Sequence, residues 1–231
     1  MRGTPRLTMI ANFAITYRCN SRCSTCGIWK MEDRGRDELS VDEIRGFFEG
    51  EADFFSGVRT IQLTGGEPYL RGDIVEIAEA IWEGIPRAFI WVATNGLLPE
   101  GIHAHTQEML EKKGGGGVGV TVSIEGVDRV HDDQRGVEGA YSRACETLRK
   151  LAKLRERHPT LRLSVGMTIT PNNQHQIVEA LTTAEHYDAD FTVRPVNVSE
   201  AYYRNCKLPG EWRFDELASG LEAVARHTIR R

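Results

Sequence analysis

Several features that would place a chain in a broad class are missing from this sequence. No apolar run approaches the ~20 residues that a membrane-spanning helix requires. No sustained apolar segment follows the basic residues near the N-terminus, as a signal peptide would need. The formal net charge of −4 argues against a general electrostatic role at nucleic acids or membrane surfaces. We therefore expect a cytoplasmic protein without a nucleic-acid or membrane partner.

Cysteine is scarce, and its placement is uneven. The 231 residues contain five cysteines, and three of them, Cys19, Cys23 and Cys26, form a C-x3-C-x2-C triplet. An odd count with a clustered triplet favours a reducing compartment and metal binding over a disulfide framework. Thiolates suit iron–sulfur clusters or zinc, but no fourth cysteine or histidine follows at the short spacing of a structural zinc site. Three ligands on a four-iron cluster would leave one iron open to bind another molecule.

Strand and helix patterns alternate along the chain. Apolar and β-branched runs predict strands at 13–17, 58–63, 88–93, 118–122, 161–169 and 190–195. Apolar residues at helical spacing predict helices around 41–48, 74–82, 106–113, 141–152 and 177–184, the first opened by a capping box of Ser40 and Glu43. The alternation predicts an α/β fold with a parallel sheet, either a doubly wound open sheet or an incomplete barrel. The unusual polar stretches follow strands, at the edge where parallel sheets bind ligands.

Two motifs together resemble those of a known family. The cysteine triplet follows the first predicted strand, and Gly65-Gly66-Glu67-Pro68 follows the second. In this combination the chain resembles the radical S-adenosylmethionine (radical SAM) superfamily over roughly residues 12 to 196. The resemblance implies a partial (β/α)6 TIM-like barrel, a parallel sheet with outer helices, formed by residues 1–200. Residues 201–231 are expected to form a C-terminal tail or helix that serves as a lid or is a truncated extension.

The resemblance also implies two cofactors. A [4Fe–4S] cluster is expected on the three cysteines, with S-adenosylmethionine (SAM) bound to its open iron. Reductive cleavage of SAM would give a 5′-deoxyadenosyl radical that abstracts hydrogen from a small-molecule or peptide substrate. An electron donor such as flavodoxin or ferredoxin is the expected partner. The alternative from a different class is a non-catalytic zinc or iron–sulfur module for metal binding or electron transfer.

Residues that follow the predicted strands are the candidates for holding SAM. The resemblance assigns cofactor binding to Gly65, Gly66, Glu67, Pro68, Asn95, Ser123, Glu125, Arg135 and Ile169. A carboxylate and exposed carbonyls suit the amino group of SAM, and a guanidinium suits its carboxylate. Plainer interpretations remain open: a glycine turn, an Asn-Gly turn, a surface ion pair of Arg135, and barrel core for Ile169 and Met167.

Some positions depart from the family pattern or carry no assignment. Thr25 precedes the third cysteine where relatives often have an aromatic residue, so Trp29 is a candidate for contact with adenine. Glu125 stands where Asp is more usual. Lids are expected at 27–37 or in the tail from Ala201. The sequence assigns no catalytic residue, and it assigns no role to Arg194, Tyr202 or Cys206.

Overall fold

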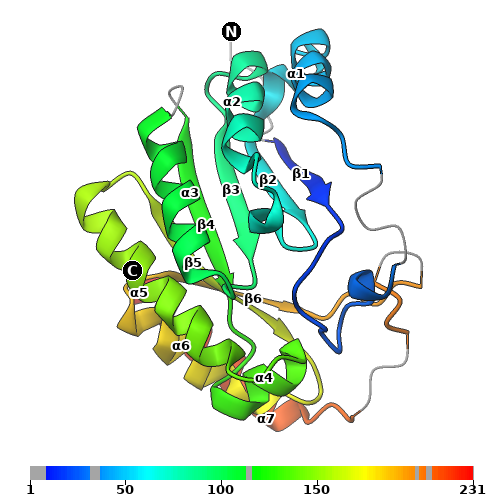
Figure 1. Ribbon diagram of the computed structural model, residues 1–231. Helices are drawn as coiled ribbons and strands as arrows, with labels where there is room; N and C mark the ends of the chain where they lie inside the picture. The colour runs from blue at the N-terminus through cyan, green and yellow to red at the C-terminus, as the bar shows by residue number, and fades with distance from the viewer. Residues whose placement is uncertain (1–8, 32–36, 113–115, 201–202, 207–209, 231) are drawn as a thin grey trace, which may run out of the picture.

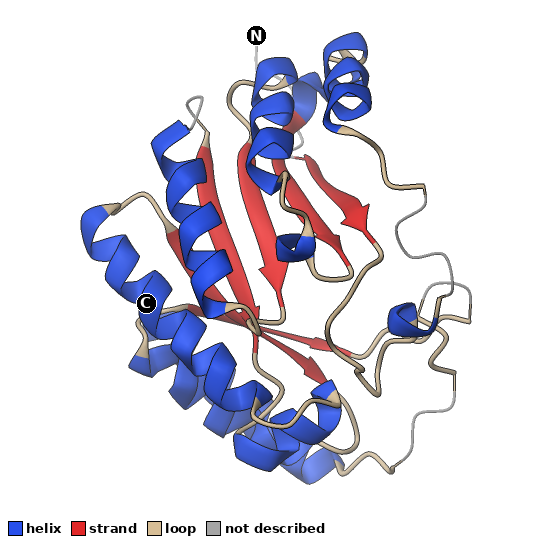
Figure 2. Cartoon of the chain, in the orientation of Figure 1, coloured by secondary structure: helices blue, strands red, loops and turns tan. Residues whose placement is uncertain are grey.

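The computed structural model describes residues 9–31, 37–112, 116–200, 203–206 and 210–230 of the chain. Its centre is a six-stranded sheet, drawn as arrows in Figure 1 and in red in Figure 2. The strands are β1 (Met9–Thr16), β2 (Val58–Gly65), β3 (Phe89–Thr94), β4 (Gly117–Ser123), β5 (Arg162–Ile169) and β6 (Asp190–Pro195). Each one overlaps a strand predicted from the sequence, and β1 begins four residues earlier than predicted.

The order of the strands decides between the two sheet architectures. Each strand pairs with its neighbours in sequence, in the order β1-β2-β3-β4-β5-β6, and every pairing is parallel. A doubly wound sheet would reverse this order partway and carry helices on both faces. Here the long helices cover one face, and within the described residues β1 and β6 form the two edges (Figure 1). The predicted partial (β/α)6 barrel, open on one side, is therefore confirmed.

Helices form the outer layer. They are α1 (Val41–Gly50), α2 (Ile74–Gly84), α3 (Pro99–Lys112), α4 (Asp128–Arg135), α5 (Ala140–Arg157), α6 (Ile177–His186) and α7 (Phe214–Arg230). The capping box that opens α1 is present: Glu43 N donates to Ser40 Oγ at 3.3 Å, and Ser40 N donates to Glu43 Oε2 at 2.8 Å. α4 was not predicted, because its sequence is almost wholly polar and buries only His131 and Gln134.

The two faces of the sheet have different roles. Residues that point toward the helices are fully buried, as Ile61, Leu63, Ile90 and Val92 show. Burying each of these side chains contributes ~1.5–3 kcal/mol. Their neighbours along each strand point to the concave inner face, because side chains alternate in a strand, and many of them are only half-buried. The core thus lies between sheet and helices, and the concave face is left for other contacts.

The C-terminal segment divides between two places. α7 packs against α6, where a Cβ on Gly220 would lie 2.8 Å from the Ile177 side chain. Residues 203–206 lie instead beside the loop that follows β1, and Gly27 N donates to Tyr203 O at 2.5 Å. Of the C-terminal segment, residues 203–206 lie next to the loop that follows β1, whereas α7 lies against α6. Of the expected lids, residues 32–36 and 201–202, with Tyr202 among them, lie outside the described residues.

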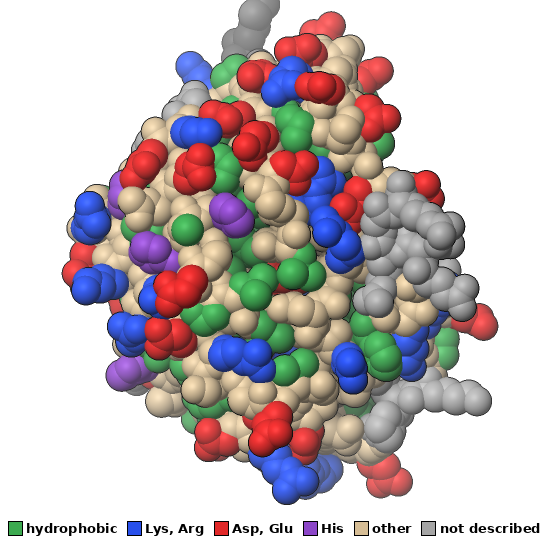
Figure 3. Space-filling model, in the orientation of Figure 1, with side chains coloured by type: hydrophobic (Ala, Val, Ile, Leu, Met, Phe, Trp, Pro, Cys, Tyr) green, Lys and Arg blue, Asp and Glu red, His purple; other side chains and the backbone are tan. Residues whose placement is uncertain are grey.

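The helix-covered surface carries charges of both signs. Figure 3 shows Lys and Arg side chains interspersed with Asp and Glu across this face. Such a mixed face agrees with the small net charge of the sequence. Within the described part of the chain, no helix combines the length and the apolar character that crossing a bilayer requires.

Candidate active site

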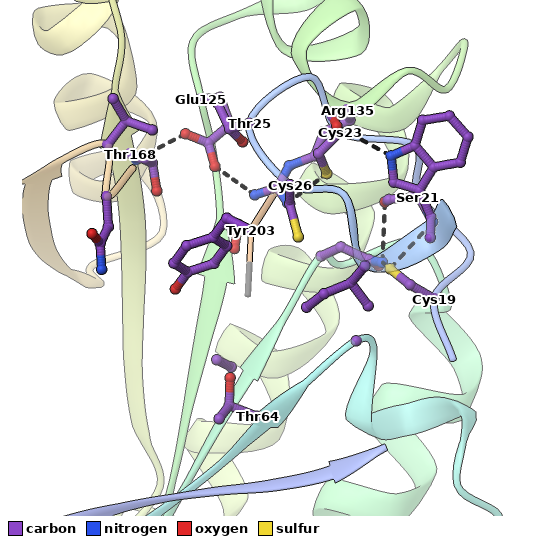
Figure 4. Close-up of a pocket in the computed structure, with 18 of the residues that line it drawn as sticks. Cys19, Ser21, Cys23, Thr25, Cys26, Thr64, Glu125, Arg135, Thr168 and Tyr203 are labelled. Atoms are coloured by element: carbon purple, nitrogen blue, oxygen red, sulfur yellow. Dashed lines mark hydrogen bonds and ion pairs between the residues drawn. The ribbon is translucent and has the colours of Figure 1, made fainter. Parts of the chain in front are cut away.

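One cavity lies at the C-terminal edge of the sheet, and it collects residues from the whole chain. All three cysteines of the triplet line it, on the loop that leaves β1. The residues contributed by the ends of the other strands include Thr64, Ala93, Ser123, Thr168 and Arg194. Figure 4 shows Glu125, Arg135 and the cysteine side chains directed toward this space. The structure therefore brings together most of the candidates that the sequence placed after separate strands.

The three cysteines of the triplet present free thiols to one cavity. Each is free and half-buried in the wall of the cavity. Among the described residues, no three His, Cys, Asp or Glu side chains lie close enough to hold a single ion. Burial raises the pKa of Cys19 to about 11 and also raises the pKa of Cys26, so a metal bound there would have to displace their protons.

Asn95 fixes the position of the cysteine loop from the end of β3. Its Nδ2 donates to Asn20 Oδ1 at 2.7 Å and to Ser21 Oγ at 3.2 Å, and it lies 4.0 Å from Cys19 Sγ. Its Oδ1 accepts from Leu97 N at 2.9 Å, which is the Asn-Gly turn that the sequence left open. Asn95 therefore both forms the turn and faces the loop that carries the cysteines.

The two glycines after β2 are required by backbone packing. Gly65 has a φ of +117°, and a Cβ on it would lie 2.1 Å from Thr16 O. A Cβ on Gly66 would lie 2.0 Å from Arg18 O. Gly66 N donates to Thr16 O at 2.7 Å, which ties this loop to the exit of β1. Both glycines also line the cavity, where their backbone is accessible to a ligand.

The Glu67 side chain lies beneath the cavity and does not line it. Its fully buried carboxylate accepts from Tyr69 N at 3.2 Å, Thr94 Oγ1 at 2.8 Å and Asn95 N at 2.7 Å. Burial raises its pKa to about 7, against the effect of these three hydrogen bonds. Pro68 is buried beside it and is likewise absent from the cavity wall. The carboxylate thus supports Asn95 from below, a geometry that differs from the direct contact with an amino group expected from the sequence.

Glu125 and Arg135 form a buried ion pair at the cavity wall. Arg135 Nη2 lies 2.6 Å from Glu125 Oε1, and Thr168 N donates to Glu125 Oε2 at 2.8 Å. Arg135 Nη1 donates to Cys23 Sγ at 3.6 Å, and within the described residues its buried Nε has no partner. Burial by itself would lower the pKa of Arg135, but the carboxylate of Glu125 together with Cys23 and Cys19 more than offsets this and raises it. A guanidinium that stays charged at the wall of the cavity suits an anionic ligand.

The remaining residues of the His131-Asp-Asp-Gln-Arg135-Gly136 stretch shape the backbone around this pair. His131 Nδ1 accepts from Glu125 N at 3.0 Å, and burial lowers the pKa of His131 to about 3. Asp132 accepts from the backbone N–H groups of Gly139 and Tyr141 at the start of α5. Gly136 has a φ of +63° and lies against the backbone of the cysteine loop, where a Cβ would be 2.5 Å from the carbonyl oxygen of Arg22.

The other candidates fall into two groups. Ser123 lines the cavity, and so does Trp29, whose Nε1 donates to Cys23 O at 3.3 Å. Ile169 and Met167 are buried in the core and do not line the cavity. The sequence did not single out Thr168 or Tyr203, which also line it. Alternation along the fifth strand could have indicated Thr168, whereas no pattern indicates Tyr203.

Fold and site together define a class: a parallel partial barrel whose first loop presents three cysteines to a cavity at the sheet edge. The family model described as the Radical SAM superfamily matches residues 13–184, and the chain belongs to this superfamily. Members of the superfamily use a [4Fe–4S] cluster and SAM, which confirms the two cofactors expected from the sequence.

Relatives and solved structures extend the comparison. The chain is 34% identical over 161 residues to Fe-coproporphyrin III synthase of Methanosarcina barkeri, a match that covers 70% of this chain and 36% of that protein. It is 30% identical over 191 residues to AdoMet-dependent heme synthase of Nitratidesulfovibrio vulgaris, covering 81% and 47%. SuiB of Streptococcus suis, crystallised with SAM, shares the fold with a TM-score of 0.72 at 17% identity, covering 98% of this chain and 49% of that one. The chain thus spans half or less of the length of these proteins.

Proposed function

We propose that this chain is the catalytic core of a radical SAM enzyme that abstracts hydrogen from its substrate. The observation that carries the proposal is the shared cavity, in which three free cysteines face a buried arginine and two glycines with accessible backbone. When bound, the cluster and SAM supply a 5′-deoxyadenosyl radical, and the protein supplies position and charge. The match of residues 13–184 to the radical SAM superfamily supports a cluster over the zinc module that the sequence left as an alternative.

Each part of the cavity wall has a proposed task. Cys19, Cys23 and Cys26 hold the cluster. The backbone of Gly65 and Gly66 accepts from the amino group of SAM, since carbonyls are the acceptors that an ammonium requires. The carboxylate of SAM is held by Arg135, whose side chain lines the cavity. Ser123 and Asn95, which lie on the same cavity, complete the polar contacts.

Substrate and partner follow from the same proposal. The two curated relatives act, by their names, on tetrapyrroles, and this supports a small-molecule substrate over a peptide. An electron donor of the flavodoxin or ferredoxin class supplies the reducing electron, and a reducing cytoplasm suits the free cysteines. Residues 203–206, which are hydrogen-bonded to the loop of the cysteines, close one side of the cavity.

The test is an anaerobic assay. The chain is reconstituted with iron and sulfide, reduced and given SAM, and 5′-deoxyadenosine is measured by mass spectrometry. We expect the wild type and Cys206→Ala to form it, because Cys206 is exposed and does not line the cavity. Cys23→Ala should form none. A wild-type protein that assembles a reducible cluster and still makes no 5′-deoxyadenosine, with or without cell extract as a source of substrate, would sink the proposal.

A further inference from the structure

The concave face of the sheet continues below the cavity and carries a platform of two aromatic rings. Phe89 and Trp91 lie on β3 on the same face as Ala93, which lines the cavity. Strands rise ~3.3 Å per residue, so Trp91 lies about 7 Å below Ala93. Both rings are half-buried, and neither belongs to the fully buried core between sheet and helices.

Two glycines on the neighbouring strand let these rings lie flat. Phe89 pairs with Gly117 and Trp91 with Gly119 across the β3–β4 ladder. A Cβ on either glycine would come within 2.5 Å of the ring opposite, so each ring rests directly on the backbone of β4. The ring centroids are 5.4 Å apart with planes inclined by 31°. One face of each ring is thus used for packing on β4, and the other is turned toward the concave side.

The polar edge of Trp91 is already occupied. Its Nε1 donates to Thr121 Oγ1, a side chain on the same face of β4. The indole therefore offers the concave side its ring surface and no free donor. Such a surface suits stacking with another conjugated ring, which prefers an offset arrangement over the π face.

Polar side chains flank the platform at the level of Trp91. The strand register places Asn12, Gln62, Trp91, Gly119 and Arg162 in one row across five strands. Asn12 and Arg162 are exposed and Gln62 is half-exposed. In the part of the chain that the structure describes, none of these three polar side chains makes a hydrogen bond or an ion pair. The row combines a stacking surface at its centre with a guanidinium at one end, which suits a carboxylate.

We propose that the Phe89–Trp91 platform is the substrate-recognition surface for a wide, flat, conjugated ring system that carries carboxylates, with Arg162 as the carboxylate partner. The inference rests on the proposed function, because it places this substrate directly below the cavity for SAM. The width of the platform, two rings on successive rungs, favours a macrocycle over a single nucleobase. The specificity of the chain then lies in Trp91, Gly119 and Arg162, which lie outside the cofactor cavity.

The test measures binding without cluster or SAM, so it is independent of radical chemistry. Iron coproporphyrin III, a flat macrocycle with four carboxylates, is titrated into the full chain and followed by its absorbance. We expect saturable one-to-one binding that Trp91→Ala weakens at least tenfold. Trp212→Ala is the matched control and should bind as the wild type, because Trp212 is a partly exposed residue of the C-terminal segment. GTP, a smaller ring with phosphates, is the second ligand and should not displace the macrocycle.

Two milder variants test the same surface in case Trp91→Ala fails to fold. Gly119→Ala places a methyl group against the indole, and we expect several-fold weaker binding with an unchanged circular dichroism spectrum. Arg162→Gln should weaken binding several-fold and reduce its salt dependence. Equal binding of the macrocycle by wild type, Trp91→Ala and Gly119→Ala would overturn the inference, as would tighter binding of GTP. Failure of the proposed function would instead appear as absent 5′-deoxyadenosine, whatever the binding results.

Discussion

His131 gives the sharpest quantitative prediction from the site. It is fully buried, its Nδ1 accepts from Glu125 N, and its Nε2 has no partner among the described residues. Burial and the nearby Arg135 lower its pKa to about 3, so the folded protein keeps the ring neutral. An unfolded chain takes up the proton near pH 6.5. The stability that His131 contributes is therefore present above pH 6.5 and is lost as the pH falls toward 3.

The size of this effect follows from the two pKa values. Between pH 7 and pH 5 the unfolded state gains most of a proton at this position and the folded state gains almost none. At ~1.36 kcal/mol per pKa unit, the unfolding free energy falls by about 2 kcal/mol over this interval. His131→Asn keeps an acceptor for Glu125 N and does not titrate. We expect its stability relative to the wild type to rise by that amount from pH 7 to pH 5.

Urea unfolding of the metal-free, reduced protein at pH 5, 6 and 7 measures this difference. The wild type and His131→Asn are compared at each pH, because both contain Glu67 and its effect cancels in the difference. In either protein alone, Glu67 changes the stability with pH in the direction opposite to His131. Burial raises the pKa of Glu67 from about 4.5 to about 7, so the stability it contributes is lost as the pH rises through 7. The matched control is His175→Asn, which changes an exposed histidine outside the site. Parallel curves for His131→Asn and wild type would refute the neutral buried histidine.

Three further predictions concern Glu67, Gly66 and Asn95. In the wild type, protonation of buried Glu67 adds stability as the pH falls from 7 to 5, and Glu67→Gln removes this gain. The unfolding free energy of Glu67→Gln, measured in urea melts, should therefore fall by about 2 kcal/mol more than that of the wild type over this interval. Gly66→Ala should lose more than ~2 kcal/mol and bind less iron after reconstitution, because its methyl group meets Arg18 O, whereas Gly72→Ala has open space and should match the wild type in both measurements. Asn95→Ala should lower the iron content per chain, measured by colorimetric assay, while a folded circular dichroism spectrum shows that only the cysteine loop has lost its support.

The sequence predicted the fold because the central strands β3, β4 and β5 bury one face completely. Apolar, β-branched runs such as that of β4 are typical of strands buried in a parallel sheet, and the helices that alternate with them indicate the same architecture. The polar α4 could not be predicted this way, because it is held by hydrogen bonds between the cysteine loop and the carbonyls of Gln134 and Arg135 and not by an apolar stripe. α3 was predicted to start near 106 and starts at Pro99, because its first turn has little amphipathic character.

The sequence predicted which residues share the cavity better than it predicted how their side chains are arranged. The cysteines, Ser123 and Arg135 line one cavity because parallel strands all end at the same edge. The direction of the Glu67 side chain depends instead on donors that arrive from the end of β3, and no local pattern contains that information. The same holds for Tyr203, which reaches the cavity through a segment that follows the last strand.

The residues that hold the cysteine loop in place come from distant parts of the sequence, and this affects when the loop can reach its final conformation during synthesis. The loop is made early, after β1, but its backbone is held by Asn95, by the end of α4 and by Asn205, which donates to Thr25 O across 180 positions of sequence. Contacts of such long separation form late in folding. The three cysteines thus leave the ribosome before the residues that hold their loop, and a cluster assembled on them would follow folding of the segments up to Asn205.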